Sequence, residues 1–213
     1  MKTTITACLL LLVMTANSQN SKFENAISKN LEQLQGVKTG DDMQSVTNAF
    51  ERIAAAESKE WLAQYYAGMS NILTGMRQES NDKRDEYYDK ALSYIEKADA
   101  LNANNSEVYV LKSWALGMKI SVDPANRGMT LGPESGMLSA KAKEFDPLNP
   151  RTYYLMGQSA MYTPEQFGGG KDRAIALLEE SLEKFKTFKP SSPIMPNWGE
   201  KQAKDALEQC KKM

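Results

Sequence analysis

The residues of this sequence that could do chemistry are few, because histidine is absent from all 213 positions. Histidine is the commonest general base and the commonest metal ligand, so histidine-dependent triads and histidine-based zinc sites are excluded. The carboxylates Asp123, Glu134 and Glu165 fall in expected loops, and Tyr162 or Arg127 would be their partners for acid–base work. Their spacing indicates no catalytic pair. We therefore predict no enzymatic activity, no cofactor and no metal.

One glycine run resembles a phosphate-binding loop. In Phe167-Gly168-Gly169-Gly170-Lys171-Asp172, the position that should hold the first glycine of such a loop is Glu165. The lysine is followed by Asp172 rather than by Ser or Thr. We interpret the run as a turn before a helix whose first turn contains Asp172. A small anion held by its backbone N–H groups is the alternative.

The first 18 residues are typical of a secretory signal peptide. Lys2 is followed by the apolar stretch Ile5–Met14, and Ala16-Asn17-Ser18 has small residues where a signal peptidase needs them. We predict cleavage after Ser18 and a periplasmic or secreted protein. Ten apolar residues are too few to cross a bilayer, which needs roughly 20, so no membrane span is expected in the mature chain.

The remaining chain, residues 19–213, is expected to form a single domain. It retains one cysteine, Cys210, so an internal disulfide is excluded. We expect Cys210 to be buried, with a thiol that pairs between chains as the alternative. The whole sequence has 26 basic and 27 acidic residues. This balance lacks the basic surplus of nucleic-acid-binding proteins, and no nucleic-acid partner is expected.

Helix-forming residues and apolar periodicity predict nine helices and no sheet. Gly36 ends the first helix, and Asp41 or Asp42 caps the second. One face of the first helix contains Phe23, Ile27, Leu31 and Leu34, and the second helix contains Met43, Val46, Ala49, Phe50 and Ile53. The other expected helices run from about Glu60 to Met76, Lys83 to Leu101, Asn105 to Ser121, Glu134 to Phe145, Pro150 to Tyr162, Lys171 to Phe188 and Gly199 to Lys211.

The even-numbered helices share a motif of two small residues with a larger apolar residue between them. The copies are Ala49-Ile53-Ala56, Ala91-Ile95-Ala98, the weaker Ser135-Ser139-Ala142, and Ala174-Leu178-Ser181, and they start 42, 44 and 39 residues apart. The last helix repeats the motif in Ala203-Leu207-Cys210. Small residues at this spacing allow two helices to approach closely. The motif therefore predicts repeated helix pairs.

The segment Ala142–Gly157 contains Asp146-Pro147-Leu148-Asn149 followed by an aromatic residue, a leucine and a glycine. This order resembles the tetratricopeptide repeat (TPR) family, and Ala91–Leu111 is a second, weaker match. The resemblance covers about residues 42–188 and implies an all-α, right-handed solenoid of about four helix pairs with a C-terminal capping helix. The chain is also similar to exported bacterial TPR-like proteins.

The expected repeats are longer than the usual TPR unit of about 34 residues. The extra length falls in residues 78–85, 121–133 and 162–170, which we expect to be loops on one edge. A further segment, residues 189–199, has a proline at every third position and should be extended. These loops are either functional or merely tolerated insertions.

The first helix of each TPR pair lines the concave face, so the resemblance implies a set of groove residues. They are Tyr65, Met69, Trp114, Met118, Tyr154, Gln158 and Met161. Such residue types at helical spacing are also usual in a core. Tyr162 and Trp198 are added from the loops, and Trp198 is expected either to clamp the last helix to the repeats or to join a ligand site.

We therefore predict an exported binding protein. The favoured hypothesis is a scaffold for a protein or peptide partner, and it requires an open groove with exposed aromatic residues. The alternative is a small-molecule binder whose loops close a pocket, similar in architecture to helical-repeat helper subunits of solute transporters. That alternative requires Trp114, Tyr162 and Trp198 to converge.

Overall fold

The computed structural model describes residues 21–213, and within this range the chain is all-α, with no β-strand. Residues 21–35 are helical. The elements that follow are α2 (Gly40–Ala56), α3 (Trp61–Gly75), α4 (Asn81–Leu101), α5 (Ser106–Val122), α6 (Pro124–Phe145), α7 (Pro150–Tyr162), the short 3-10 helix η1 (Glu165–Phe167), α8 (Lys171–Thr187) and α9 (Glu200–Lys212). The predicted signal peptide lies outside the described residues.

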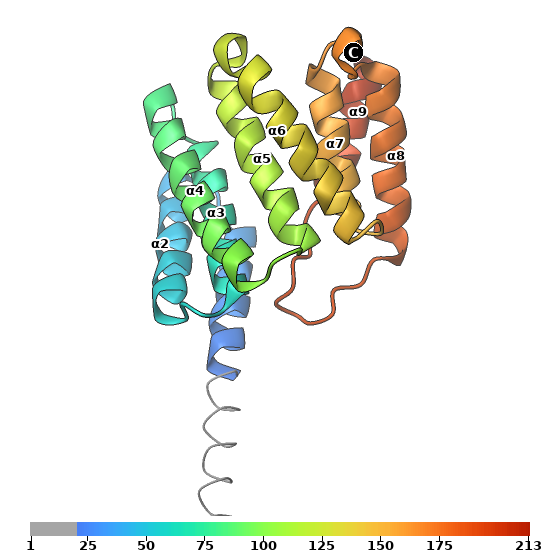
Figure 1. Cartoon of the computed structure of the whole chain (residues 1–213). Coiled ribbons are helices and arrows are strands. Elements are labelled where there is room, and N and C mark those ends of the chain that lie inside the picture. Colours follow the sequence, from blue (N-terminus) through green and yellow to red (C-terminus); the bar gives the residue numbers. More distant parts are fainter. Residues whose placement is uncertain (1–20) are drawn as a thin grey trace, which may run out of the picture.

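Consecutive helices form hairpins that lie next to one another in chain order (Figure 1). The helix α3 packs along α4, α5 packs along α6, and α7 packs along α8. Among the first helices of these hairpins, α5 also contacts both α3 and α7, so the three share one layer. The C-terminal helix α9 packs on α8 and α7.

Most predicted helix boundaries agree with the structure, but the N-cap of α2 is not the predicted Asp41 or Asp42. Its N-cap is Thr39, whose hydroxyl accepts a hydrogen bond from the Asp42 backbone N–H, while the Asp42 carboxylate accepts one from Thr39 N–H. Asp42 is thus the third residue of a capping box rather than the cap itself. The prediction for α7 agrees with the structure at both ends.

The predicted loop at residues 121–133 is wrong, because α6 begins ten residues earlier than expected. Asp123 caps the helix by accepting from Asn126 N–H, and Pro124 occupies the first turn, where no N–H is needed. Arg127 then pairs with Asp85 of α4, which fixes this first part of α6 to its neighbour. Pro133 is accommodated inside the helix. Tertiary contacts here override weak helix propensity.

The small-residue motif is buried in α4 and α8, buried at its two small residues in α9, partly buried against α5 in α6, and misplaced in α2. The motif residues of α4 and α8 are buried against α3 and α7, and Ala203 and Cys210 are buried in α9. In α2, however, Ala56 is exposed. The buried face of that helix contains Thr47 and Ala54 instead, and the Thr47 hydroxyl lies 2.7 Å from that of Thr74 in α3.

The core consists of two apolar clusters that meet at two tryptophans. One cluster joins residues 21–35, α2, α3, α4 and part of α5, and the other joins α7, α8 and α9 with parts of α5 and α6. Trp114 and Trp198 pack against both clusters. Among the residues that the structure describes, none of the helices has the length and apolar character that a bilayer crossing requires.

Candidate functional site

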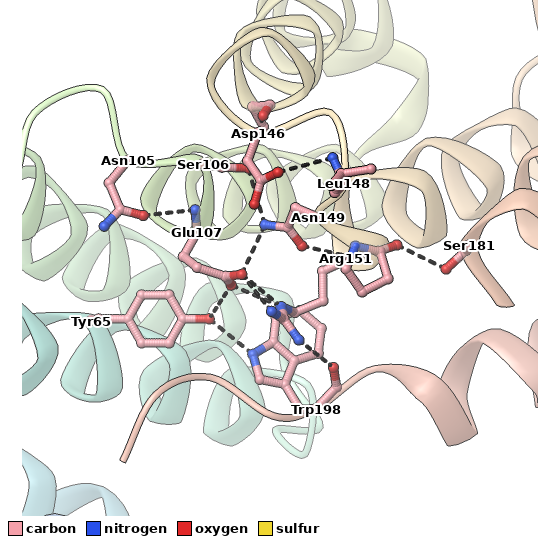
Figure 2. A network of polar contacts seen from close by, with 12 residues as sticks. Tyr65, Asn105, Ser106, Glu107, Asp146, Leu148, Asn149, Arg151, Ser181 and Trp198 are labelled. Carbon is pink, nitrogen blue, oxygen red and sulfur yellow. Dashed lines mark hydrogen bonds and ion pairs between the residues drawn. The ribbon is translucent and has the colours of Figure 1, made fainter. Parts of the chain in front are cut away.

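A buried ion pair between Glu107 and Arg151 lies where α5 meets α7 (Figure 2). The Arg151 Nη2 atom lies 2.5 Å from Glu107 Oε1, and Nε lies 2.8 Å from Oε2. The Arg151 side chain is 1% exposed, and the Glu107 side chain is 11% exposed. A fold tolerates a charge removed from water in this way only while its partner is present and both are hydrogen-bonded.

Two capping turns of the same kind, one at the start of α5 and one at the start of α7, position the two charges. Asn105 caps α5 and accepts from Glu107 N–H, and Asn149 caps α7 and accepts from Arg151 N–H. The Asn149 side-chain amide also donates to Glu107 Oε1 at 2.8 Å and to the Ser106 hydroxyl at 3.0 Å. Each charge therefore follows its capping asparagine by two residues, and adjacent hairpins bring the opposite charges together.

Sequence reasoning missed this ion pair. The available signal was a matched pattern in Asn105-Ser106-Glu107 and Asn149-Pro150-Arg151. In each segment an asparagine is followed two residues later by a charged residue, and the two charges are opposite. Equivalent positions of neighbouring repeats lie side by side, so opposite charges there indicate a pair.

An aromatic cluster lies directly against the ion pair. The Trp198 indole N–H donates to the Tyr65 hydroxyl at 2.9 Å, and that hydroxyl donates to Glu107 Oε2 at 3.4 Å. The Trp198 ring stacks on Trp114, with ring centroids 5.1 Å apart, and meets the Tyr154 ring edge-on at 6.4 Å. Side chains from α3, α5 and α7 therefore converge on Trp198, which lies outside the hairpins.

Residues 188–199, which we call the strap, connect α8 to α9 across the layer formed by α3, α5 and α7. The Tyr66 hydroxyl donates to the Ile194 carbonyl at 2.6 Å, and Arg151 Nη1 donates to the Trp198 carbonyl at 3.2 Å. Ile194 is buried in the core cluster of α2, α3 and α4. Trp198 thus folds back on the hairpins, as predicted, and joins the last helix to them.

The tyrosine hydroxyls near the strap are held in their protonated form. Burial, with a contribution from the Glu107 carboxylate, raises the pKa of Tyr65 well above its ordinary value. Burial also raises the pKa of Tyr66 and raises that of Tyr154 to about 12. The Tyr65 and Tyr66 hydroxyls serve as hydrogen-bond donors, and all three hydroxyls are poorly suited to act as general bases at neutral pH.

The predicted ligand residues occupy three different settings. The buried members are Tyr65, Met69, Tyr154 and Met161, and the half-buried members are Trp114, Met118, Gln158 and Trp198. Tyr162 is 68% exposed, and its hydroxyl accepts from Gln209 of α9. Trp114 and Trp198 therefore meet, whereas Tyr162 lies apart from them. The strap covers part of the face that was expected to be an open groove.

The glycine run after η1 uses its backbone N–H groups internally. Gly168 N–H donates to the Glu165 carbonyl, Gly169 N–H donates to the Pro164 carbonyl, and Gly170 N–H donates to the carbonyls of Ala160 and Thr163. These three groups are unavailable to an anion, so the run is a turn, as we favoured. Cys210 is buried, which agrees with its prediction as a small apolar residue.

Two of the hollows on the surface of the described chain bear on ligand binding. One, of about 420 Å³, lies between the C-terminal ends of α2 and α4 and is lined mainly by apolar side chains, among them Ala54, Tyr94 and Leu101. The other, of about 400 Å³, lies beside the ion pair and is lined by polar residues and the strap. Because Glu107 and Arg151 satisfy each other, we consider the apolar hollow the better candidate for a ligand.

The chain is similar to a solved helical protein over most of its length. The HusA haemophore from Porphyromonas gingivalis shares 34% sequence identity with it, and the match covers 89% of this chain and 93% of that one with a TM-score of 0.80. This chain belongs to the HusA family. No protein-family model matches it, and no curated protein does. Because the match to HusA spans nearly all of both chains, the shared feature is the whole helical arrangement rather than one hairpin.

Proposed function

We propose that this protein is an exported carrier of haem or a closely related tetrapyrrole. The observation that carries the proposal is the relationship to the HusA haemophore, which holds over nearly the whole of both chains at 34% identity. A haemophore binds its ligand without transforming it. The relationship therefore favours binding over catalysis, and it favours the small-molecule hypothesis over the protein scaffold.

Two features of the structure support a small ligand. An open groove with exposed aromatic residues is what a peptide scaffold needs, whereas here the strap places Trp198 against Tyr65, Trp114 and Tyr154. The apolar hollow between α2 and α4, of about 420 Å³, falls within the size range of small-molecule pockets, about 300–1,000 Å³. A hollow of this kind suits an apolar ligand.

The repeat architecture forms part of the same proposal. Hairpins stacked in chain order, with the first helices in one layer, support a TPR-like right-handed solenoid closed by α9. On this arrangement Met118, Gln158 and Tyr162 stay proposed contacts for a ligand or partner, because their side chains are at least partly exposed. An experimental structure would test the handedness and the stacking.

The binding proposal is tested by titrating the purified protein with ferric haem and following the Soret absorbance. We expect a saturable change of the haem spectrum at micromolar protein, and co-migration of haem with the protein in gel filtration. Bovine serum albumin and a helical-repeat protein of similar size are the positive and negative controls. An unchanged spectrum together with separate elution of haem would refute the proposal.

Export is tested separately by expressing the full chain in a Gram-negative host and fractionating the cells. We expect the protein outside the cytoplasm with Gln19 as its first residue, because Ala16-Asn17-Ser18 satisfies the cleavage pattern. Mass spectrometry of the purified protein reads the N-terminus directly. A full-length chain retained in the cytosol would contradict this part of the proposal.

A further inference from the structure

The polar hollow beside the ion pair has three walls, and we call it the turn–strap hollow. Two walls are the equivalent turns of neighbouring repeats, residues 102–107 between α4 and α5 and residues 146–151 between α6 and α7. The third wall is the strap, which passes both turns at the same end of the hairpins (Figure 1). The volume of the hollow, about 400 Å³, lies at the small end of the range for ligand pockets, about 300–1,000 Å³.

The innermost residues of the lining are polar, buried and bonded to one another. They are Ser106, Glu107, Asn149 and Arg151. The Asn149 amide donates both of its protons, one to the Ser106 hydroxyl and one to Glu107, and Glu107 pairs with Arg151. These four residues therefore form a fixed floor, and a ligand above them does not have to break the ion pair.

The outer part of the lining has polar groups without partners. Within residues 21–213, the side chains of Asn102, Asn104 and Ser191 make no hydrogen bond. Asn105 is the counterpart of Asn149 in the preceding repeat, and its amide oxygen caps α5, but its amide nitrogen has no acceptor in the described chain. Donors and acceptors left over on the wall of a hollow are available to a ligand.

The unpaired charges of the lining cancel. Asp146 Oδ1 accepts from Leu148 N–H, whereas Oδ2 has no partner within the described residues, and the side chain makes no ion pair there. Lys189 of the strap also has no ion pair in that range. One acid and one base remain, and the ion pair of the floor is neutral as well. The hollow therefore has no surplus of charge that would select an anion or a metal ion.

A ligand that matches this lining is neutral, has several hydroxyl groups and has one apolar face. A hydroxyl group both donates and accepts, so it can pair with amides, a carboxylate and a serine in the same site. The apolar part of the lining, which faces the same space, is formed by Phe188, Pro190 and Met195. A pyranose sugar combines hydroxyl groups around its ring with a face of C–H groups.

We propose that the turn–strap hollow binds a neutral pyranose sugar, with Asn102, Asn104 and Asp146 as hydrogen-bond partners of its hydroxyl groups. This activity goes beyond the binding of a tetrapyrrole and uses different residues. Pro190 and Pro196 restrict the backbone of the strap wall, so the site is largely formed before the sugar arrives.

Saturation-transfer difference NMR on the wild-type protein tests the site. The probes are the methyl glycosides of glucose, galactose, mannose and N-acetylglucosamine, together with glucose 6-phosphate as a charged comparison. We expect transfer to at least one neutral glycoside, with a Kd on the order of millimolar, because each partly exposed hydrogen bond contributes little. Absence of transfer to all four glycosides, or stronger transfer to glucose 6-phosphate than to methyl glucoside, would overturn the proposal.

Two amides are then removed without disturbing the turn. Asn104 has a φ of 61°, which glycine adopts without strain, so Asn104→Gly removes the amide alone. Combined with Asn102→Ala, it should weaken the affinity for the bound glycoside by about tenfold. The matched control is Asn197→Ala, which removes an exposed amide from the strap outside the hollow and should bind as the wild type does. An unchanged affinity in the double variant would show that the sugar does not contact these amides.

A blocking variant gives a second measurement that does not depend on the strength of single hydrogen bonds. Ser191 is exposed, so the fold should tolerate Ser191→Trp, whose ring would occupy the hollow. We expect it to lose saturation transfer, whereas Asn197→Trp keeps it, with thermal unfolding to verify that both variants are folded. Transfer retained in Ser191→Trp would place the sugar elsewhere. Haem titrations report on a different ligand, so failure of the sugar site and failure of the proposed function are distinguishable.

Discussion

The Glu107–Arg151 pair shows how much can depend on two side chains. Both are buried, and the Asn149 amide, the Tyr65 hydroxyl and the Trp198 carbonyl are hydrogen-bonded to them. Such a pair adds little stability compared with apolar residues of the same shape, but a single charge left without its partner is strongly destabilising. The pair therefore fixes which surfaces of α3, α5, α7 and the strap meet.

The first prediction concerns this pair. Arg151→Met should lower the free energy of unfolding by about 3–5 kcal/mol, because it leaves the Glu107 carboxylate buried without a cation. The double variant Glu107→Leu/Arg151→Met should be more stable than that single variant. Urea unfolding followed by circular dichroism measures both. Lys201→Met is the control, since its partner Asp205 is exposed and the change should stay within about 0.5 kcal/mol. A loss below about 1 kcal/mol in Arg151→Met would show that the carboxylate is not trapped.

The second prediction concerns the pH dependence of stability. Burial raises the pKa of Tyr154 from 10.0 to about 12, the nearby Asp205 carboxylate adds to the rise, and a hydrogen bond with Gln158 opposes it. The folded state therefore favours the protonated hydroxyl. This contribution is complete below pH 10 and should fall by about 2–3 kcal/mol as the pH rises from about 10 to 12.

Unfolding of the wild type and of Tyr154→Phe at several pH values in this window measures the effect. We expect a shallower decline in Tyr154→Phe, which has no hydroxyl to ionise. Tyr162→Phe, which removes an exposed hydroxyl, is the control. Parallel profiles for the wild type and Tyr154→Phe would contradict the assignment.

At the scale of elements, the third prediction separates two helical glycines by their surroundings. A Cβ at Gly136 in α6 would meet nothing within 4 Å, so Gly136→Ala should stabilise the protein by about 0.5–1 kcal/mol through lower backbone entropy of the unfolded chain. A Cβ at Gly157 in α7 would lie 2.7 Å from Leu178 Cγ, so Gly157→Ala should destabilise it by about 1–3 kcal/mol. Thermal unfolding of the two variants beside the wild type should show melting temperatures that move in opposite directions. A shift in the same direction would mean that the α7–α8 contact is not tight.

The elements themselves were largely predictable, and the exception has a local cause. Pro150 and Asn149 are signals of a helix start that act within a few residues, so the bounds of α7 were predicted correctly. The first ten residues of α6 contain glycines and prolines that disfavour a helix locally. Their helix depends on the pair of Arg127 with Asp85, which is far away in the sequence, and on the hydrogen bond that Arg127 donates to the Lys119 carbonyl of α5.

The candidate site was less predictable for the same reason. The large apolar residue Trp198 signalled that the strap folds back, but its partners depend on how the hairpins stack.

At the scale of the whole molecule, the composition limits how haem iron could be held. The full sequence contains no histidine, so the usual imidazole ligand is unavailable, and only weaker or less common ligands such as methionine and tyrosine remain. Binding would then draw most of its free energy from burial of the macrocycle and from pairing of its carboxylates. Both of those features are the same in haem and in metal-free protoporphyrin.

The fourth prediction follows from this balance. Metal-free protoporphyrin should bind with an affinity within about tenfold of that of ferric haem, which corresponds to about 1.4 kcal/mol. Parallel titrations, followed by Soret absorbance for haem and by fluorescence for the metal-free ring, measure the two affinities. A haem affinity a hundredfold or more above that of the metal-free ring would instead require a strong iron ligand from the protein, and the dominance of apolar burial would be wrong.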